Sequence, residues 1–175
     1  MRNWNRNSAW NCHERHACFQ CRPTIALSVI DRLDLLNLLF DEVTVPEAVH
    51  FELMEGGVKQ AGITAYQQAH WINTGKLQAP LDPLLDSVLD IGEASVIQLA
   101  RENNIHCVLI DERKGRQIAR EIYNLRVIGS ARILVEAKRL GHLDNVENCI
   151  NAMRRHGYWL HEKIVSVILK EAGER

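Results

Sequence analysis

Two short apolar segments of this chain, Ile105–Asp111 and Leu125–Ser130, are separated by a single helical segment, Glu112–Asn124. The apolar density of the first segment is typical of a strand that is buried on both faces of a sheet. Strands joined by one helix pack side by side in parallel, with a right-handed crossover. The pattern therefore predicts an α/β fold, a three-layer α/β/α sandwich in which helices cover both faces of a central parallel sheet.

The same alternation continues along the chain. Glu42–Pro46 is expected to form a short strand that ends at proline, and Thr24–Phe40 carries aliphatic residues at helical spacing. Further helices are expected over 46–55, 58–70, 90–103, 131–141, 146–156 and 161–172. The last two of these follow the predicted sheet as C-terminal helices.

Composition narrows the class of protein. Hydrophobic residues make up 46% and charged residues 25% of the 175-residue chain, as in ordinary globular domains. The net charge of −1 gives no overall basic field for nucleic acid, and only a local basic patch stays open. No apolar segment reaches the roughly 20 residues that span a bilayer, and the five cysteines are odd in number and unevenly spaced. We therefore expect a cytoplasmic protein that has no membrane partner.

Residues 1–22 differ in composition from the remainder, because they contain no Ile, Leu or Val. From Pro23 onward, aliphatic residues recur at helical spacing. We therefore expect an aberrant or disordered leader over residues 1–22 and a single folded domain over residues 23–175.

A cluster of metal-binding residue types lies within this leader. Cys18-x-x-Cys21 has the spacing of one half of a structural zinc site. Cys12, His13 or His16 would have to complete such a site. No second Cys-x-x-Cys pair follows it. Zinc and a disulfide are therefore weaker interpretations than an unstructured leader, or a segment that imitates a missing strand.

Acidic residues fall where the predicted fold brings strand ends together. Asp111 ends a predicted strand, and Glu112 follows it. Glu93 opens the helix before that strand, and Glu52 lies in the helix after the strand at 42–46. Parallel sheets bind ligands at the carboxyl ends of their strands, and carboxylates that converge there require a cation such as Mg²⁺ or Mn²⁺. The alternative is that these four are solvated surface groups.

Five motifs in this order resemble the PIN-domain proteins, in particular a bacterial subfamily of predicted nucleic acid-binding proteins. They are "PTIALSVIDRLDLL", "VTVPEAVHFEL", "GEASVIQLA", "VLIDERKGRQIAR" and "VIGSARILVEAKRLG", and the likeness extends from Pro23 to Glu174. The resemblance implies a small α/β/α sandwich and Mg²⁺- or Mn²⁺-dependent cleavage of single-stranded RNA. It also implies the toxin half of a toxin–antitoxin pair, silenced by a small antitoxin protein, and a homodimer.

The resemblance assigns roles to the same acidic residues. Glu52 matches the acidic residue after the second strand of the family, and Glu93 matches the one at the start of the central helix. Asp111 matches the one that ends the fourth strand. These three are thereby implied as catalytic and metal-binding, and Glu112 stands where the subfamily often has a second Asp, as a further metal-site residue.

By the same analogy, three basic residues, Arg113, Lys114 and Arg116, lie near the pocket and meet RNA phosphates. The other interpretation is that they form a solvated helix face. Ser130 lies beside the pocket in the resemblance. From the residues alone, the turn around Ser130 is a phosphate-binding turn or, more simply, a strand-to-helix turn that Ser130 caps.

The chain departs from the family at the first strand, which ends in Asp or Asn followed by a small residue, Ser and Pro. Here Gln20 or its neighbour holds the ligand position, and Gln is a poor substitute for a carboxylate on Mg²⁺. Codons for Cys-Phe-Gln-Cys, read one base later, can encode Val-Ser-Asn-Ala, and one restored base returns the frame at Pro23. Our hypothesis is that residues 1–22 are out of frame. The missing ligand favours an alternative function, a catalytically inactive PIN-like module that binds nucleic acid or protein.

Overall fold

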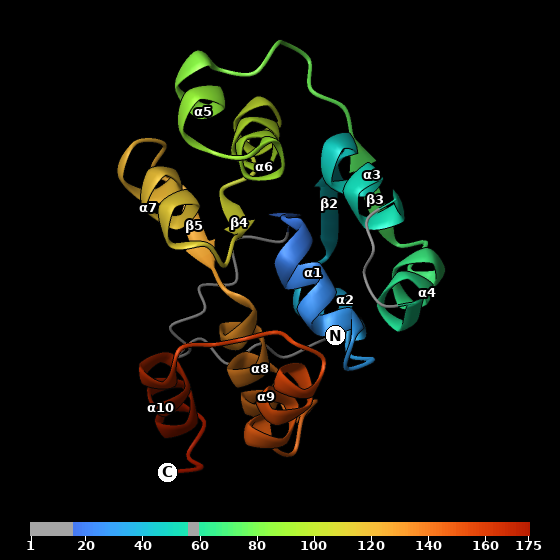
Figure 1. Ribbon diagram of the computed structural model, residues 1–175, viewed down its shortest axis with the longest axis vertical. Coiled ribbons are helices and arrows are strands. Elements are labelled where there is room, and N and C mark those ends of the chain that lie inside the picture. The colour runs from blue at the N-terminus through green and yellow to red at the C-terminus, as the bar shows by residue number, and fades with distance from the viewer. Residues whose placement is uncertain (1–15, 56–59) are drawn as a thin grey trace.

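Five parallel strands form one sheet in the order β3-β2-β1-β4-β5 (Figure 1). The computed structural model describes residues 16–55 and 60–175. The strands are β1 (His16–Phe19), β2 (Glu42–Pro46), β3 (Ile72–Gly75), β4 (Cys107–Leu109) and β5 (Arg126–Ile128). An α/β fold with a parallel sheet is confirmed.

The central strand, β1, falls inside the segment that composition marks as a leader. It pairs with β2 on one side and with β4 on the other, through registers such as Ala17 with Val43 and Ala17 with Cys107. Ala17, Cys18 and Phe19 are wholly buried. The expected boundary at Pro23 thus differs from the structure, in which residues 16–22 belong to the sheet and its first turn. Residues 1–15 lie outside the described part of the chain.

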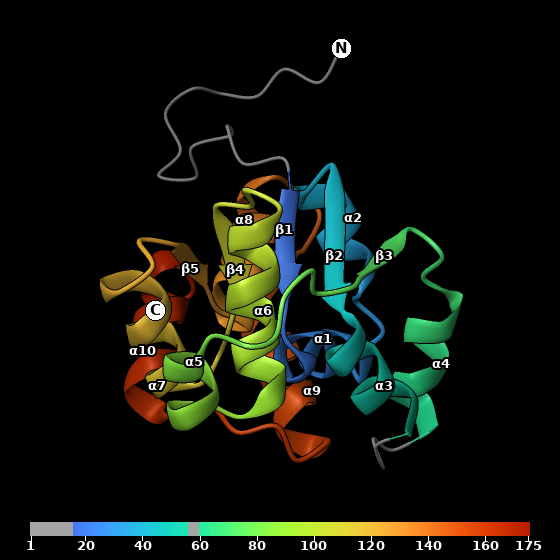
Figure 2. The same ribbon diagram turned by 90° about the horizontal axis from the view of Figure 1, so that it is seen from above.

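Helices cover both faces of the sheet. On one face α6 packs against the three central strands, and α5 and α3 lie beside it (Figure 2). On the other face lie α2 and α8, and α9 and α10 pack outside α8. The helices are α1 (Cys21–Ser28), α2 (Asp34–Leu39), α3 (Glu47–Glu55), α4 (Gln60–Gln68), α5 (Pro83–Val88), α6 (Ile91–Glu102), α7 (Arg113–Glu121), α8 (Ser130–Arg139), α9 (Val146–Arg155) and α10 (Glu162–Glu171). No helix of the described residues has the length and apolar character to cross a bilayer.

The segment Thr24–Phe40, with its aliphatic residues at helical spacing, contributes to two helices, α1 and α2. Asp31 adopts a left-handed backbone conformation with φ of 56°, and the backbone N–H of Arg32 donates to the carbonyl of Leu27 at 2.9 Å. Such a left-handed residue ends a helix, and Asp tolerates it better than branched residues do. The turn lets α1 and α2 contact different neighbours.

The C-terminal tail is fixed by Glu174. Its carboxylate accepts hydrogen bonds from the backbone N–H groups of Val146, at 2.6 Å, and Glu147, at 2.8 Å, which open α9. It also pairs with Lys138 of α8 at 2.6 Å. Although burial opposes ionisation, these hydrogen bonds outweigh it and lower the pKa of Glu174. A negative charge at a helix N-terminus is favourable, so this residue ties α8, α9 and the tail together.

Candidate metal centre

Glu93 is the buried acid of the site. It lies in the first turn of α6, at the carboxyl edge of the sheet, with 5% of its surface exposed, and its Oε1 atom has no hydrogen-bond partner among the described residues. Burial, followed by the nearby charges of Asp90 and Glu112, raises the pKa of Glu93 to about 7. An unpaired carboxylate oxygen in such a place is costly unless a proton or a cation compensates it.

Local sequence explains how Glu93 is held. Asp90 caps α6, because its side chain accepts the backbone N–H of Glu93 at 2.8 Å. Gly115 of α7 leaves room for the carboxylate, since a Cβ atom there would lie 2.5 Å from Glu93 Oε1. Glycine at that position therefore allows α6 and α7 to approach around the acid.

Glu52 reaches the same edge from α3. It is exposed, and its Oε2 atom lies 3.3 Å from the position of a Cβ on Gly92, at the start of α6. The thiol of Cys21 donates a hydrogen bond to this carboxylate. Burial and the charge of Glu52 raise the pKa of Cys21, so the sulfur stays protonated and acts as a donor.

Glu112 lies at the N-terminus of α7. Its Oε1 atom pairs with Arg22 Nε at 2.8 Å, and its Oε2 atom is buried without a hydrogen-bond partner in the described chain. Gln20, which ends the central strand, also carries a buried and unpaired Oε1 atom. Three unpaired oxygens, one each on Gln20, Glu93 and Glu112, thus lie at the carboxyl edge.

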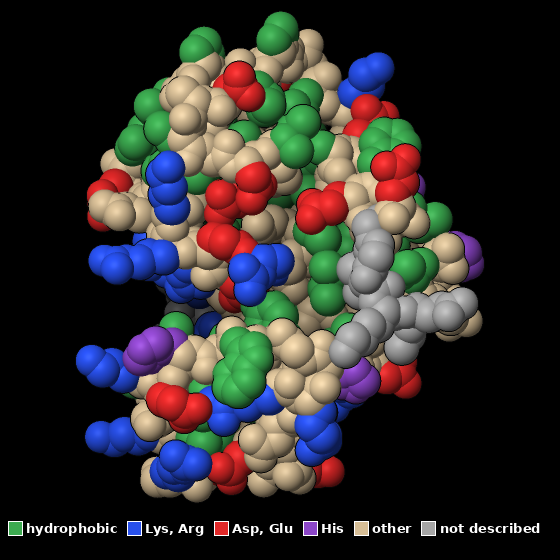
Figure 3. Space-filling model, viewed as in Figure 1, with side chains coloured by type: hydrophobic (Ala, Val, Ile, Leu, Met, Phe, Trp, Pro, Cys, Tyr) green, Lys and Arg blue, Asp and Glu red, His purple; other side chains and the backbone are tan. Residues whose placement is uncertain are grey.

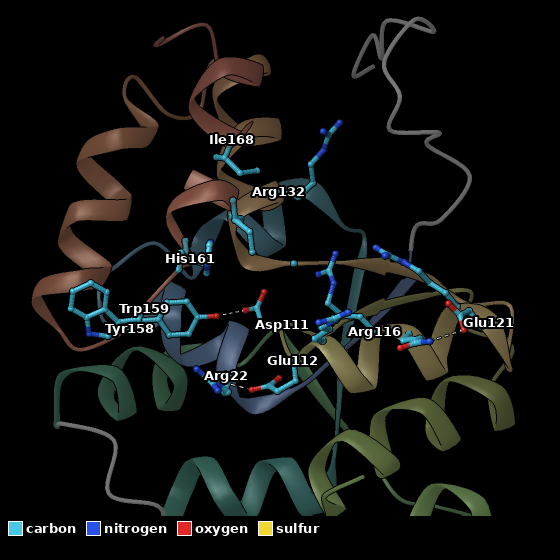
Figure 4. A pocket seen from close by; sticks show the side chains of 17 residues that line it. Arg22, Asp111, Glu112, Arg116, Glu121, Arg132, Tyr158, Trp159, His161 and Ile168 are labelled. Carbon is cyan, nitrogen blue, oxygen red and sulfur yellow. Dashed lines mark hydrogen bonds and ion pairs between the residues drawn. The ribbon is translucent and has the colours of Figure 1, made fainter. Parts of the chain in front are cut away.

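Asp111, which precedes Glu112, is bound by a different set of partners. Its Oδ1 atom accepts the backbone N–H of Ser130 at 2.9 Å, and its Oδ2 atom accepts the hydroxyl of Tyr158 (Figure 4). Asp111 therefore sits at the N-terminus of α8, where a negative charge is favourable. Burial and the charge of Asp111 raise the pKa of Tyr158, so the phenol remains a donor.

The four acidic residues predicted from the sequence therefore do not form one cluster. Glu93 and Glu112 are neighbours, Glu52 lies beside them across Cys21 and Gly92, and Asp111 is engaged elsewhere. In residues 16–55 and 60–175 no three His, Cys, Asp or Glu side chains are placed to hold one metal ion. The reason is visible in the contacts, because Cys21, Arg22 and Tyr158 each bind one of the carboxylates.

The residues present nevertheless fit a hard divalent cation. The unpaired oxygens of Glu93, Glu112 and Gln20 are carboxylate and amide oxygens, the atoms that Mg²⁺ and Mn²⁺ prefer. A cation would compensate the charge repulsion that raises the pKa of Glu93. Glu93 and Glu112 are the acids that would hold it, with Gln20 as a neutral ligand.

The predicted basic residues occupy different positions relative to the site. The charge of Lys114 acts on Glu93. Arg113 and Arg116 line a large cavity on the Asp111 side, and Arg116 Nη1 donates to the carbonyl of Ile110 at 2.9 Å. Ser130 is the first residue of α8 and lies beside Asp111, but its hydroxyl does not cap the helix, because Gly129 is the N-cap residue and Asp111 takes that role.

Sequence reasoning missed three residues of the site. Asp90 had a signal, because an acid three positions before Glu93 forms a capping pattern. Arg22 and Tyr158 had none, since each depends on a contact between distant elements. Among the described residues, Cys18, Cys21 and Cys149 are free thiols. The remaining zinc candidates of the leader, Cys12 and His13, lie outside the described residues.

Comparison with known proteins gives one family. Neither the curated proteins nor the solved structures contain a match to this chain. The family model that matches is described as a PIN domain and covers residues 18–174, which includes all five strands except the first two residues of β1. The chain belongs to the PIN domain family, whose members are generally nucleases and typically bind divalent metal ions.

Proposed function

We propose that this protein is a metal-dependent ribonuclease that cleaves single-stranded RNA. The observation that carries the proposal is the group of buried, unpaired oxygens on Gln20, Glu93 and Glu112 at the carboxyl edge of a PIN-domain sheet. Buried polar atoms are otherwise almost always hydrogen-bonded. A site that leaves three of them unpaired is suited to a cation.

The chemistry follows from the donor set. Glu93 and Glu112 would hold a divalent cation, which when bound would supply polarisation of a phosphoryl oxygen and activation of a water. Glu93, whose pKa is about 7 without a cation, would lose its proton when a cation binds and would hold it as a carboxylate. Lys114 and Arg113 lie at the start of α7 beside these acids and attract the phosphate of the substrate.

The direct test is cleavage of a labelled single-stranded RNA in Mn²⁺, with and without EDTA. Glu93→Gln and Glu112→Gln remove one charge each at the site, and we expect both to lose activity. Asp86→Asn, on the exposed face of α5, is the matched control and should keep full activity. Cleavage that persists in EDTA, or that Glu93→Gln leaves unchanged, would refute the proposal.

A second candidate function rests on Gln20 and Arg22. A neutral side chain ends the central strand, and the Arg22 guanidinium already occupies Glu112 at 2.8 Å. Both features lower the charge available to a cation and favour a PIN-like module that binds nucleic acid or protein without cutting it. A chain in which residues 16–22 are replaced by Met-Leu-Val-Ser-Asn-Ala-Ser separates the two. Activity in the replaced chain alone would assign the inactive role to the present sequence.

The proposal extends to the binding partners of this protein. We propose that the protein is the toxin of a toxin–antitoxin pair and that it forms a homodimer. Exposed apolar side chains support contact with other chains, with Phe51 on α3 56% exposed and Ile91 on α6 66% exposed. Growth arrest on expression, relieved by a co-expressed small partner, tests the first statement. Light scattering of the purified protein tests the second.

A further inference from the structure

An arginine-lined groove lies beside Asp111 and Glu112. It has a volume of about 730 Å³ and runs between α7, the start of α8 and the segment from Tyr158 to Ile168 (Figure 4). Five arginines line it: Arg22, Arg113, Arg116, Arg120 and Arg132. In Figure 3 the groove is the hollow at the left side of the molecule, with basic side chains above and below it.

Arginines outnumber acids in the lining of this groove by five to three. Asp111 is held by Tyr158 and Ser130, and Glu112 is paired with Arg22. Glu121 accepts a hydrogen bond from Gln117, and Arg132 is paired with Glu136 and Glu171, which do not line the groove. Burial and the nearby charge of Arg120 lower the pKa of Arg116, and the charge of Asp111 acts in the opposite direction. Arg116 and Arg120 also line the same cavity, so the two guanidinium groups lie close together. Clustered cations of this kind suit a polyanion.

A second cavity, of about 320 Å³, extends the groove past the end of β5. Arg116, Arg120 and Arg132 line both cavities. Two of these have their guanidinium oriented by the protein, since Arg116 donates to Ile110 and Arg120 Nη2 donates to the carbonyl of Val127 at 3.1 Å. The arginines are therefore preorganised along a track rather than scattered over a surface.

An exposed aromatic ring stands at the rim. The indole of Trp159 is 70% exposed, and the guanidinium of Arg154 lies 5.9 Å from its ring. The adjacent Tyr158 is 8% exposed and is fixed by its bond to Asp111. The backbone that carries Trp159 is thus anchored, while the ring itself is presented to a ligand.

We propose that this groove binds an extended single strand of nucleic acid, with phosphates on the arginines and a base stacked on Trp159. Stacking of this kind requires an unpaired base, and it combines with a basic track in proteins that bind single strands. Arg22 and Glu112 belong both to the groove and to the acidic edge. A strand in the groove is thereby led to the candidate metal centre, so the inference deepens the proposed function and rests on it for the cleavage step alone.

The test measures binding without cleavage. Fluorescence anisotropy of a labelled single-stranded RNA is recorded in EDTA at low salt, for the full chain and three variants. Trp159→Ala removes an exposed ring, and we expect at least a fivefold weaker Kd, about the loss of one stacked base. Arg120→Ala should weaken binding and reduce the slope of log K against log salt by about 0.7, the value for one phosphate contact on a single strand.

Arg101→Ala is the matched control. Arg101 lies at the opposite end of α6, paired with Asp82 at 3.3 Å, and should leave binding unchanged. Equal binding by all variants overturns the groove, as does a loss in Arg101→Ala that equals the loss in Arg120→Ala. Absence of RNA binding by the full chain also overturns the proposed RNA groove and points to a protein as its occupant. Tighter binding of duplex RNA than of single-stranded RNA overturns the stacking of a base on Trp159.

The same experiment separates this inference from the nuclease proposal. Groove-dependent binding without cleavage in Mn²⁺ supports the groove and removes the catalytic function. Cleavage that Trp159→Ala and Arg120→Ala leave unchanged supports the nuclease and removes the groove.

Discussion

Replacing Glu93 with glutamine should stabilise this protein at alkaline pH when no metal is bound. The carboxyl group has an ordinary pKa of 4.5, and burial with Asp90 and Glu112 nearby raises it to about 7. In the folded state the group therefore binds its proton more tightly than in the unfolded state. Above pH 7 this costs the fold about 3 kcal/mol, since each tenfold change in proton affinity is worth about 1.4 kcal/mol.

The sign of the pH dependence follows from the raised pKa. Below about pH 4.5 the carboxyl group is neutral in both states, and the cost is absent. Between that pH and about 7, the unfolded chain releases the proton first, so stability falls as pH rises. Glutamine has nearly the same size and no charge. Its amide is also unpaired, which reduces the expected gain at pH 8 to about 1–3 kcal/mol.

Thermal unfolding in EDTA at pH 5 and pH 8 measures this effect. A protein of this size changes its Tm by about 2–4 °C for each kcal/mol, so Glu93→Gln should melt several degrees above the original chain at pH 8 and close to it at pH 5. Millimolar Mn²⁺ should reverse the order, because a ligand that binds the folded state stabilises it. Exposed Glu121→Gln is the control. If Glu93→Gln is less stable than the original chain at pH 8, the buried charge of Glu93 is already compensated by other groups, and the reasoning is refuted.

The remaining predictions concern the contacts that hold the other acids. Arg22→Ser should release Glu112 and tighten Mn²⁺ binding, as measured by isothermal titration; unchanged affinity would contradict this. Tyr158→Phe should destabilise the fold by about 1–3 kcal/mol in urea, because it leaves the Oδ2 atom of Asp111 without the hydroxyl donor; a loss below a few tenths would refute the contact. Glu174→Gln should destabilise at pH 7, where the lowered pKa keeps the carboxylate charged, and the difference should vanish as pH falls through that pKa. A difference in stability that does not change with pH would exclude this ionic role of Glu174.

Much of the fold could be predicted from the sequence, because buried parallel strands and amphipathic helices have distinct patterns. The strands Glu42–Pro46, Cys107–Leu109 and Arg126–Ile128 lie within the expected segments. The central strand could not be predicted, because His-Ala-Cys-Phe has neither the branched residues nor the alternation of a strand. Its position is determined by β2 and β4, whose edges would be unpaired without it.

The candidate site was predictable only in part. The start of α6 places Glu93 correctly at the sheet edge, since helix starts have local signals. The neighbours Asp111 and Glu112, in contrast, have different binding partners. Tyr158, 47 residues later in the chain, binds Asp111, whereas Arg22 binds Glu112. These two contacts decide which acid lies beside Glu93. Local sequence contains no information about either partner.

Three consecutive residues after the central strand reduce the charge that this site offers to a cation. Gln20 is neutral, Cys21 donates its thiol to Glu52, and the Arg22 guanidinium pairs with Glu112. The strand before them requires only side chains that fit between β2 and β4, and Ala17 and Cys18 satisfy that condition with complete burial. The sheet therefore tolerates the sequence of this segment, whereas the pocket does not. Asn-Ala-Ser at these three positions removes both competing donors, so a gain of metal affinity without a change of fold is what the out-of-frame hypothesis requires.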